Sequence, residues 1–220
     1  SMEWKLRKGA KALEATLTAS NDSYKNLLGI GAYAAIAAQT RLAKDGDQAP
    51  KAWEHVDMAN MSGKAWENFK YVCKVAEHSD IDIAEAIAPY EGLLDDIDAR
   101  LRPTTWWERM TKTYVAIGIF TDALREIAHL QGQEEYAKDV NDFGHGDWVR
   151  ERLEPAVAAD KQLEARLSLW TRRVGGEALS LVRAFLFTNP EIISGTDADE
   201  LMDRVSKAHK ERLSAVHLHA

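Results

Sequence analysis

Apolar residues recur along most of the chain every three to four positions, the spacing that one face of an α-helix produces. No stretch alternates apolar and polar residues for long enough to predict a strand. The pattern therefore predicts an all-α protein. Its interruptions divide the chain into helices over residues 3–19, 22–44, 50–78, 105–130, 134–159, 161–187 and 197–218, with a connection over residues 81–101.

Capping residues set the boundary between the first two helices. Residues 20–23 read Ser-Asn-Asp-Ser, and each of these residue types is a good N-cap. They predict that one helix ends and another begins at this point. The first helix is therefore short, and we expect it to pack across the bundle with its apolar set, Trp4, Leu6, Leu13 and Leu17.

Prolines and short links predict how the remaining helices are connected. Pro50 suits the first turn of the third helix, whereas Pro89 interrupts the segment after it and makes that segment a connection rather than a core helix. Short links near Asp47 and Gly132 predict two antiparallel hairpins. Two hairpins joined by one long crossover form the ferritin-like type of four-helix bundle, which is the fold class we expect.

We expect a single domain over residues 2–220, with the bundle core at about 22–187 and terminal helices at 3–19 and 197–218. The net charge of −7 disfavours unspecific binding to nucleic acid. The single cysteine, Cys73, excludes an internal disulfide and fits a reducing compartment. Neither a secretory signal nor a membrane-spanning run is found, so we expect a cytoplasmic protein with no membrane partner.

Candidate metal ligands follow from the ligand pattern of di-iron bundles, in which two helices each supply a Glu and two others each supply a Glu-x-x-His pair. Glu126 and His129 have this spacing, and so do Asp142 and His145, with Asp in place of Glu. Helix geometry sets Asp122 level with Asp142 and near His145, two or three turns into the bundle. Glu126 and His129 lie nearer the loop and form a possible second level.

The other predicted hairpin offers no ligands at the matching height. Residues 32–38 are mostly alanine, and Ser62 and Ala65 lie opposite them. Two interpretations stay open for Asp122, Asp142 and His145: a buried polar triad whose members satisfy one another, or a single-metal site completed by water. The sequence assigns no catalytic residue and favours no cofactor, with iron as the alternative.

Two segments carry a resemblance to a known family: residues 123–128, Ala-Leu-Arg-Glu-Ile-Ala, and residues 169–180, Leu-Trp-Thr-Arg-Arg-Val-Gly-Gly-Glu-Ala-Leu-Ser. They resemble the actinobacterial ferritin-like proteins grouped with the tRNA hydroxylases that act on 2-methylthio-isopentenyladenosine, the MiaE-like family. The likeness extends from about Leu27 through Phe185. It implies a ferritin-like bundle and, in active relatives, a non-haem di-iron centre that activates dioxygen to hydroxylate a modified adenosine in tRNA.

The chain departs from the ligand pattern that this resemblance implies. Where relatives carry a Glu on the first bundle helix, this chain has Ala35, and their Glu-x-x-His on the second helix falls on Ser62 and Ala65. The resemblance therefore implies a degenerate di-iron site. Its remnant is one half of the ligand set, made of Asp122, Asp142 and His145.

Three functional hypotheses follow. The first is a ferritin-like protein without iron that works as a binding or interaction module, the second is an iron-dependent hydroxylase of modified adenosine in tRNA, and the third is a carrier of a small ligand. The candidate partners are another protein, a small molecule, tRNA, or a second copy in a homodimer. A surface for RNA would use the basic residues Arg166, Arg172, Arg173, Arg183, Lys207, Lys210 and Arg212.

Overall fold

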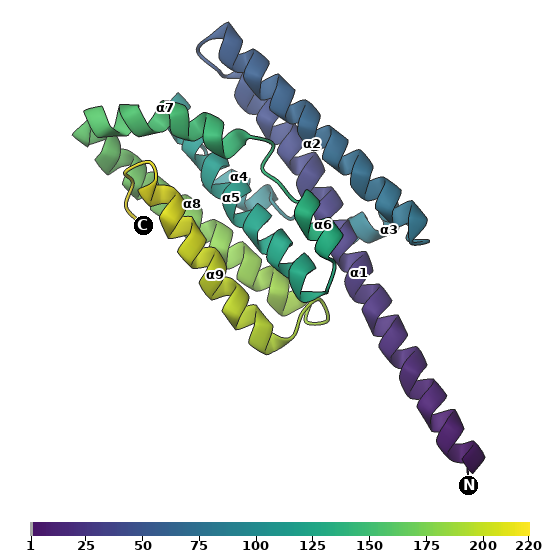
Figure 1. Ribbon diagram of the computed structural model, residues 1–220. Coiled ribbons are helices and arrows are strands. Elements are labelled where there is room, and N and C mark those ends of the chain that lie inside the picture. The colour runs from purple at the N-terminus through teal and green to yellow at the C-terminus, as the bar shows by residue number, and fades with distance from the viewer. Residues whose placement is uncertain (1) are drawn as a thin grey trace.

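The computed structural model describes the backbone of residues 2–220 and the side chains of residues 2–10 and 22–220. Helices account for every regular element of this described part, which contains no strand. Figure 1 shows a hairpin of two long helices, α1 and α2, beside a layer formed by α5, α8 and α9. The prediction of an all-α, ferritin-like bundle is confirmed.

The hairpin consists of α1 (Met2–Asp47) and α2 (Ala52–His78), which pack closely along their shared length. The predicted break at residues 20–23 is wrong, because α1 runs through it without interruption. Ser, Asn and Asp each cost only a few tenths of a kcal/mol, about 0.5, inside a helix. The stretch has neither glycine nor proline to end the helix.

The first part of α1 does not pack across the bundle as expected. It continues in line with the rest of α1 and extends past the other helices to the N-terminus (Figure 1). Trp4 is 60% exposed and Leu6 is 68% exposed. The other two residues of the predicted apolar set, Leu13 and Leu17, lie outside the described side chains.

The predicted connection is confirmed as a series of short helices, α3 (Ile83–Ile87), η1 (Ala88–Tyr90) and α4 (Asp95–Arg100). Asp82 caps α3, because its Oδ1 accepts hydrogen bonds from two backbone N–H groups of the first turn, at 3.0 and 3.3 Å. α3 also lies against α1 at Gly29, where a Cβ atom would overlap the carbonyl of Ala86. Glycine at this position therefore allows the close approach.

The second layer is built on α5 (Trp106–Leu130), which packs against α8 (Lys161–Thr188) and α9 (Gly195–Ser214). A side-chain cap begins each of these helices. Thr105 accepts from the backbone of α5, Asp160 from that of α8, and Ser194 from that of α9. The continuous hydrophobic core runs from the hairpin into this layer, and α5 and α8 contribute the largest shares of its buried residues.

The predicted helix over residues 134–159 is wrong. The segment forms α6 (Glu134–Asp139) and α7 (His145–Ala159), separated by a turn. In the turn, the Asn141 side chain accepts from the N–H of Phe143 at 2.8 Å, and the Asp142 side chain accepts from the N–H of Gly144 at 3.0 Å. Phe143 and Gly144 both have positive φ, 63° and 82°. These local hydrogen bonds compete with the helix. α5 therefore contacts two shorter helices, α6 and α7, in place of one long partner, and it packs more extensively against α8 and α9.

Candidate functional site

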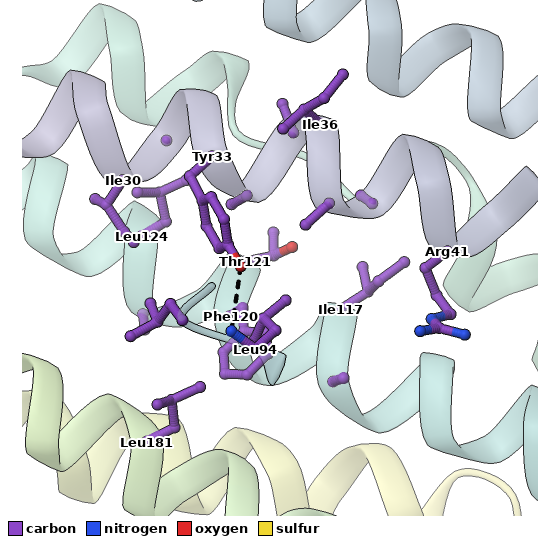
Figure 2. A pocket seen from close by; sticks show the side chains of 18 of the residues that line it. Ile30, Tyr33, Ile36, Arg41, Leu94, Ile117, Phe120, Thr121, Leu124 and Leu181 are labelled. Atoms are coloured by element: carbon purple, nitrogen blue, oxygen red, sulfur yellow. Dashed lines mark hydrogen bonds between the residues drawn. The ribbon is translucent and has the colours of Figure 1, made fainter. Parts of the chain in front are cut away.

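An elongated apolar cavity of about 490 Å³ lies between α1 and α5. Figure 2 shows Ile30, Tyr33 and Ile36 of α1 on one side and Ile117, Phe120, Thr121 and Leu124 of α5 on the other. Leu94 of the crossover and Leu181 of α8 close it further. The volume lies within the usual range of small-molecule sites, about 300–1,000 Å³.

The cavity exists because α1 presents small side chains where α5 presents large ones. Ala34, Ala35, Ala37 and Ala38 all line it. A methyl group fills little of the space between two helices whose axes are separated by about 8–10 Å. Several large apolar side chains therefore face open space and are only partly buried: Ile30, Leu93, Leu94, Ile117, Phe120 and Leu124.

Tyr33 links α1 to the crossover segment beside the cavity. Its hydroxyl oxygen accepts a hydrogen bond from the backbone N–H of Leu94 at 3.1 Å (Figure 2). Burial raises the pKa of Tyr33, so the phenol stays protonated at neutral pH.

One end of the cavity carries a charged cluster of Arg41, Lys112 and Asp98. Lys112 Nζ donates to Asp98 Oδ1 at 3.0 Å, and Arg41 Nη2 lies 3.3 Å from Asp98 Oδ2. Lys112 is buried, and burial lowers the pKa of its ammonium group while the bond to Asp98 opposes that shift. One carboxylate thus serves two cations that both line the cavity.

Asp45 lies behind this cluster and is only 1% exposed. Thr113 donates a hydrogen bond to its Oδ2 at 2.5 Å, and Arg109 Nη1 lies 3.6 Å from its Oδ1. Burial raises the pKa of Asp45 to about 6, against the opposing effects of Thr113 and the nearby arginines. Sequence reasoning missed this residue, because Asp-Gly-Asp at positions 45–47 has the pattern of an exposed helix end.

The other end of the cavity reaches the surface between α2 and α6. Asn68, Tyr71, Asp139 and Asn141 line both the cavity and an adjoining surface hollow. Tyr136 of α6 is buried beside them, and its hydroxyl occupies the space that a Cβ atom at Gly31 would need. Polar groups therefore gather at an opening, whereas the middle of the cavity is apolar.

The structure does not bring together the three predicted metal ligands. Asp122 Oδ2 lies 2.5 Å from Arg212 Nη2 on α9, and Arg125 also pairs with Asp122 at 3.3 Å. Asp142 Oδ2 accepts from the N–H of Gly146 at 3.0 Å and so caps α7. His145 is 1% exposed, its ring nitrogens have no hydrogen-bond partner, and burial lowers its pKa to about 4. The predicted triad is therefore not formed.

The second predicted level has other partners as well. Glu126 Oε2 pairs with Arg204 Nε of α9 at 2.9 Å, and His129 Nδ1 pairs with Glu134 Oε2 at 2.6 Å. Within the described part of the chain, no three His, Cys, Asp or Glu side chains are grouped so that they could hold a metal ion.

The positions that a di-iron centre would need on the hairpin do not fit that centre. Ala35 lines the cavity and Ala65 is fully buried. Ser62 donates to the backbone carbonyl of Gln39 at 2.9 Å, which ties α2 to α1. Two methyl groups and a hydroxyl that is already bonded supply neither carboxylate nor imidazole.

One of the basic residues predicted to form a surface for RNA, Arg212, is not available at the surface. Arg212 has a side-chain exposure of 16% and points into the pair with Asp122. The arginines of α8 are exposed, and Arg173 lies over the Trp170 ring with 5.8 Å to the ring centroid.

These helices define a ferritin-like protein: a long hairpin, a crossover of short helices, and a second set of helices packed against them. A model of the ferritin-like domain of actinomycetes matches residues 19–188, which run from within α1 to the end of α8. The chain belongs to this family. Comparison with curated proteins gives no significant match. Among the described residues, no helix has the length and apolar character needed to cross a membrane.

Proposed function

We propose that this ferritin-like protein is a binding protein rather than a di-iron enzyme, and that it holds an elongated apolar molecule between α1 and α5. One observation carries the proposal. The alanines of α1 leave a cavity of about 490 Å³ in the region where a di-iron bundle would place carboxylates. Enclosed apolar surface of this kind favours an apolar occupant, because the occupant leaves water on binding.

The resemblance to tRNA hydroxylases is compatible with this proposal if the protein descends from such an enzyme and has lost the metal centre. Ala35, Ser62 and Ala65 stand at the expected ligand positions of the hairpin. The carboxylates and histidines predicted as the remaining half-site have structural partners or are buried without one. The donor set therefore supports binding over oxygen chemistry.

A cavity-filling variant tests the proposal. Ala37 lines the cavity, whereas Ala43 lies on the same helix with its side chain exposed to solvent. The neutral fluorescent probe N-phenyl-1-naphthylamine is titrated into the wild type, Ala37→Phe and Ala43→Phe. We expect Ala37→Phe to weaken binding at least tenfold and Ala43→Phe to leave it unchanged. Equal binding by all three proteins would contradict the proposal.

Iron loading tests the rival hypothesis. Protein purified without chelator, and the same protein after anaerobic ferrous loading, are measured by plasma mass spectrometry. We expect neither sample to hold stoichiometric iron. About two ferrous ions per chain after loading would overturn the binding proposal and favour the hydroxylase.

A further inference from the structure

The charged end of the cavity indicates which ligand the cavity binds. This inference rests on the binding function proposed above. Arg41, Lys44 and Lys112 line the cavity there, and Asp98 is the carboxylate that pairs with two of them. Arg109 lies just behind, paired with the buried Asp45. Four cations against two carboxylates leave this end with a surplus of positive charge.

Two further acidic groups line the cavity, and one of them, Asp95, lies only one turn before Asp98 on α4. Asp95 follows Leu94 on the crossover near Tyr33, and Asp139 lies at the opening beside Tyr71. With Asp95 included, the Arg41 end still has four cations against three carboxylates, whereas Asp139 lies at the opening. An anionic head group would be attracted to the Arg41 end and repelled from the opening.

The geometry of this end suits a carboxylate. Asp98 already presents two oxygens to Lys112 and Arg41, at 3.0 and 3.3 Å, which shows that the two cations can share one carboxylate. Its side chain is 39% exposed, so water can solvate it if another anion competes for the cations. Arginine and lysine bind carboxylates through short charge-assisted hydrogen bonds.

The lining also indicates the shape of the ligand. On α1 it extends from Ile30 to Arg41 and includes most of the residues between them. At 1.5 Å per residue these eleven steps cover roughly 16 Å. Apolar residues of α5, the crossover and α8 also line the cavity. A long apolar stripe with one cationic end matches a chain-like molecule with one acidic head.

We propose that the ligand is a long-chain carboxylic acid whose carboxylate binds at Arg41 and Lys112 and whose chain lies along the alanine face of α1. The chain displaces water from the apolar middle of the cavity, and its far end approaches the opening beside Tyr71. The acidic head fixes the direction of the ligand, because the opening carries Asp139.

Calorimetric titration of delipidated protein with dodecanoic acid and with dodecan-1-ol at pH 7.5 tests this inference. The two probes share a chain and differ in the head group. We expect the wild type to bind the acid at least tenfold more tightly than the alcohol. Arg41→Gln and Lys112→Met should reduce acid binding to the level of the alcohol, and Arg183→Gln, an exposed arginine of α8 outside the cavity, should change neither.

A gain-of-affinity variant guards against loss through misfolding. Asp98→Asn removes the carboxylate that competes with the ligand, so it should tighten acid binding and leave alcohol binding unchanged. Equal binding of acid and alcohol in the wild type overturns the head-group inference while the binding function stands. Failure of both probes, and of N-phenyl-1-naphthylamine, overturns both proposals.

Discussion

Arg212 of α9 and Asp122 of α5 form an ion pair, with Nη2 and Oδ2 separated by 2.5 Å. The guanidinium lies against Gly118, where any Cβ atom would overlap it. Tyr114, one turn earlier on α5, donates to the backbone carbonyl of Arg212 at 2.8 Å. The carboxylate that sequence reasoning assigned to a metal site is thus used to dock α9, a helix that lies beyond the matched residues 19–188.

Replacing Asp122 should destabilise the protein by undocking α9. Asp122→Asn leaves the largely buried Arg212 without its counter-charge. We expect the free energy of unfolding to fall by about 1–3 kcal/mol, because a charged group that loses its partner in a poorly solvated place is costly. Urea denaturation followed by circular dichroism measures the change.

The pair between Asp147 and Arg150 provides the matched control. Both of its side chains are substantially exposed, at 83% and 38%. Asp147→Asn should change the free energy of unfolding by less than about 0.5 kcal/mol, as is typical for a surface pair. If Asp122→Asn has no larger effect than Asp147→Asn, the ion pair does not dock α9.

His145→Leu should make the protein more tolerant of acid. Burial lowers the pKa of His145 to about 4, whereas an unfolded histidine titrates near 6.5. Its contribution to stability is therefore present above pH 6.5 and is lost as the pH falls through about 4, by an amount on the order of 3 kcal/mol. Leucine removes this loss and also removes a ring whose nitrogens have no hydrogen-bond partner. Urea denaturation at pH 7 and at pH 4.5 measures both effects.

His209 should contribute to the acid sensitivity that remains in that variant. Burial lowers its pKa to about 4 as well, helped by the positive charges of Arg212 and Lys210. His145→Leu should therefore remove only part of the loss between pH 7 and pH 4.5. A variant with the full acid sensitivity of the wild type would show that His145 is protonated without cost in the folded state.

Asp45→Asn should raise stability at neutral pH. Burial raises the pKa of Asp45 to about 6 from an ordinary 3.8, so its contribution to stability is present below pH 3.8 and is lost as the pH rises through about 6. Asparagine keeps an oxygen for Thr113 but gives up the charge that faces Arg41, Arg109 and Lys112. We expect a gain of about 1–3 kcal/mol at pH 7 and none near pH 4.

Asp47→Asn is the control for Asp45, because Asp47 ends the same helix with an exposed side chain. It should change stability by less than about 0.5 kcal/mol at either pH. A loss of stability in Asp45→Asn at pH 7 would mean that the carboxylate gains more from the arginines than it loses by burial.

Ala37→Leu and Ala65→Leu should differ sharply in stability. Ala37 faces the cavity, so three additional carbon atoms fill existing space and the free energy of unfolding should stay equal or rise. Ala65 is fully buried where α2 meets α1, so the same change overpacks the interface and should cost about 1–3 kcal/mol. Thermal unfolding of both variants measures the difference, and an equal loss would mean that the cavity closes in solution.

Helix content and most helix boundaries could be predicted from the sequence. The segments ending at His78, Leu130 and Thr188 form helices close to the expected bounds, because apolar periodicity and capping signals are local. Both wrong boundaries concern polar residues that can either cap a helix or lie within one. Good caps at residues 20–23 did not end α1, whereas the side chains of Asn141 and Asp142 did interrupt a helical pattern.

The absence of carboxylates at the expected ligand positions of the hairpin could also be predicted from the sequence, because it depends only on which residues occupy positions such as Ala35, Ser62 and Ala65. The cavity could not be predicted from the sequence, because it depends on the distance between α1 and α5 and on the closure by Leu94 and Leu181. The partners of polar residues were not predictable either. Asp142 lies three residues before His145, a spacing that would place both on one face of a helix. The positive φ of Gly144 interrupts the helix between them, so they do not share that face.

The sequence by itself therefore determined an all-helical, ferritin-like chain and the residue types available to a site in it. Only the tertiary structure decided that Asp122 pairs with Arg212, that Asp45 is buried, and that Arg41 and Lys112 share Asp98 at one end of an apolar cavity. The physical reason is that periodicity and capping act within a few residues of the chain. Ion pairing, burial and cavity shape depend on atoms brought together from distant helices.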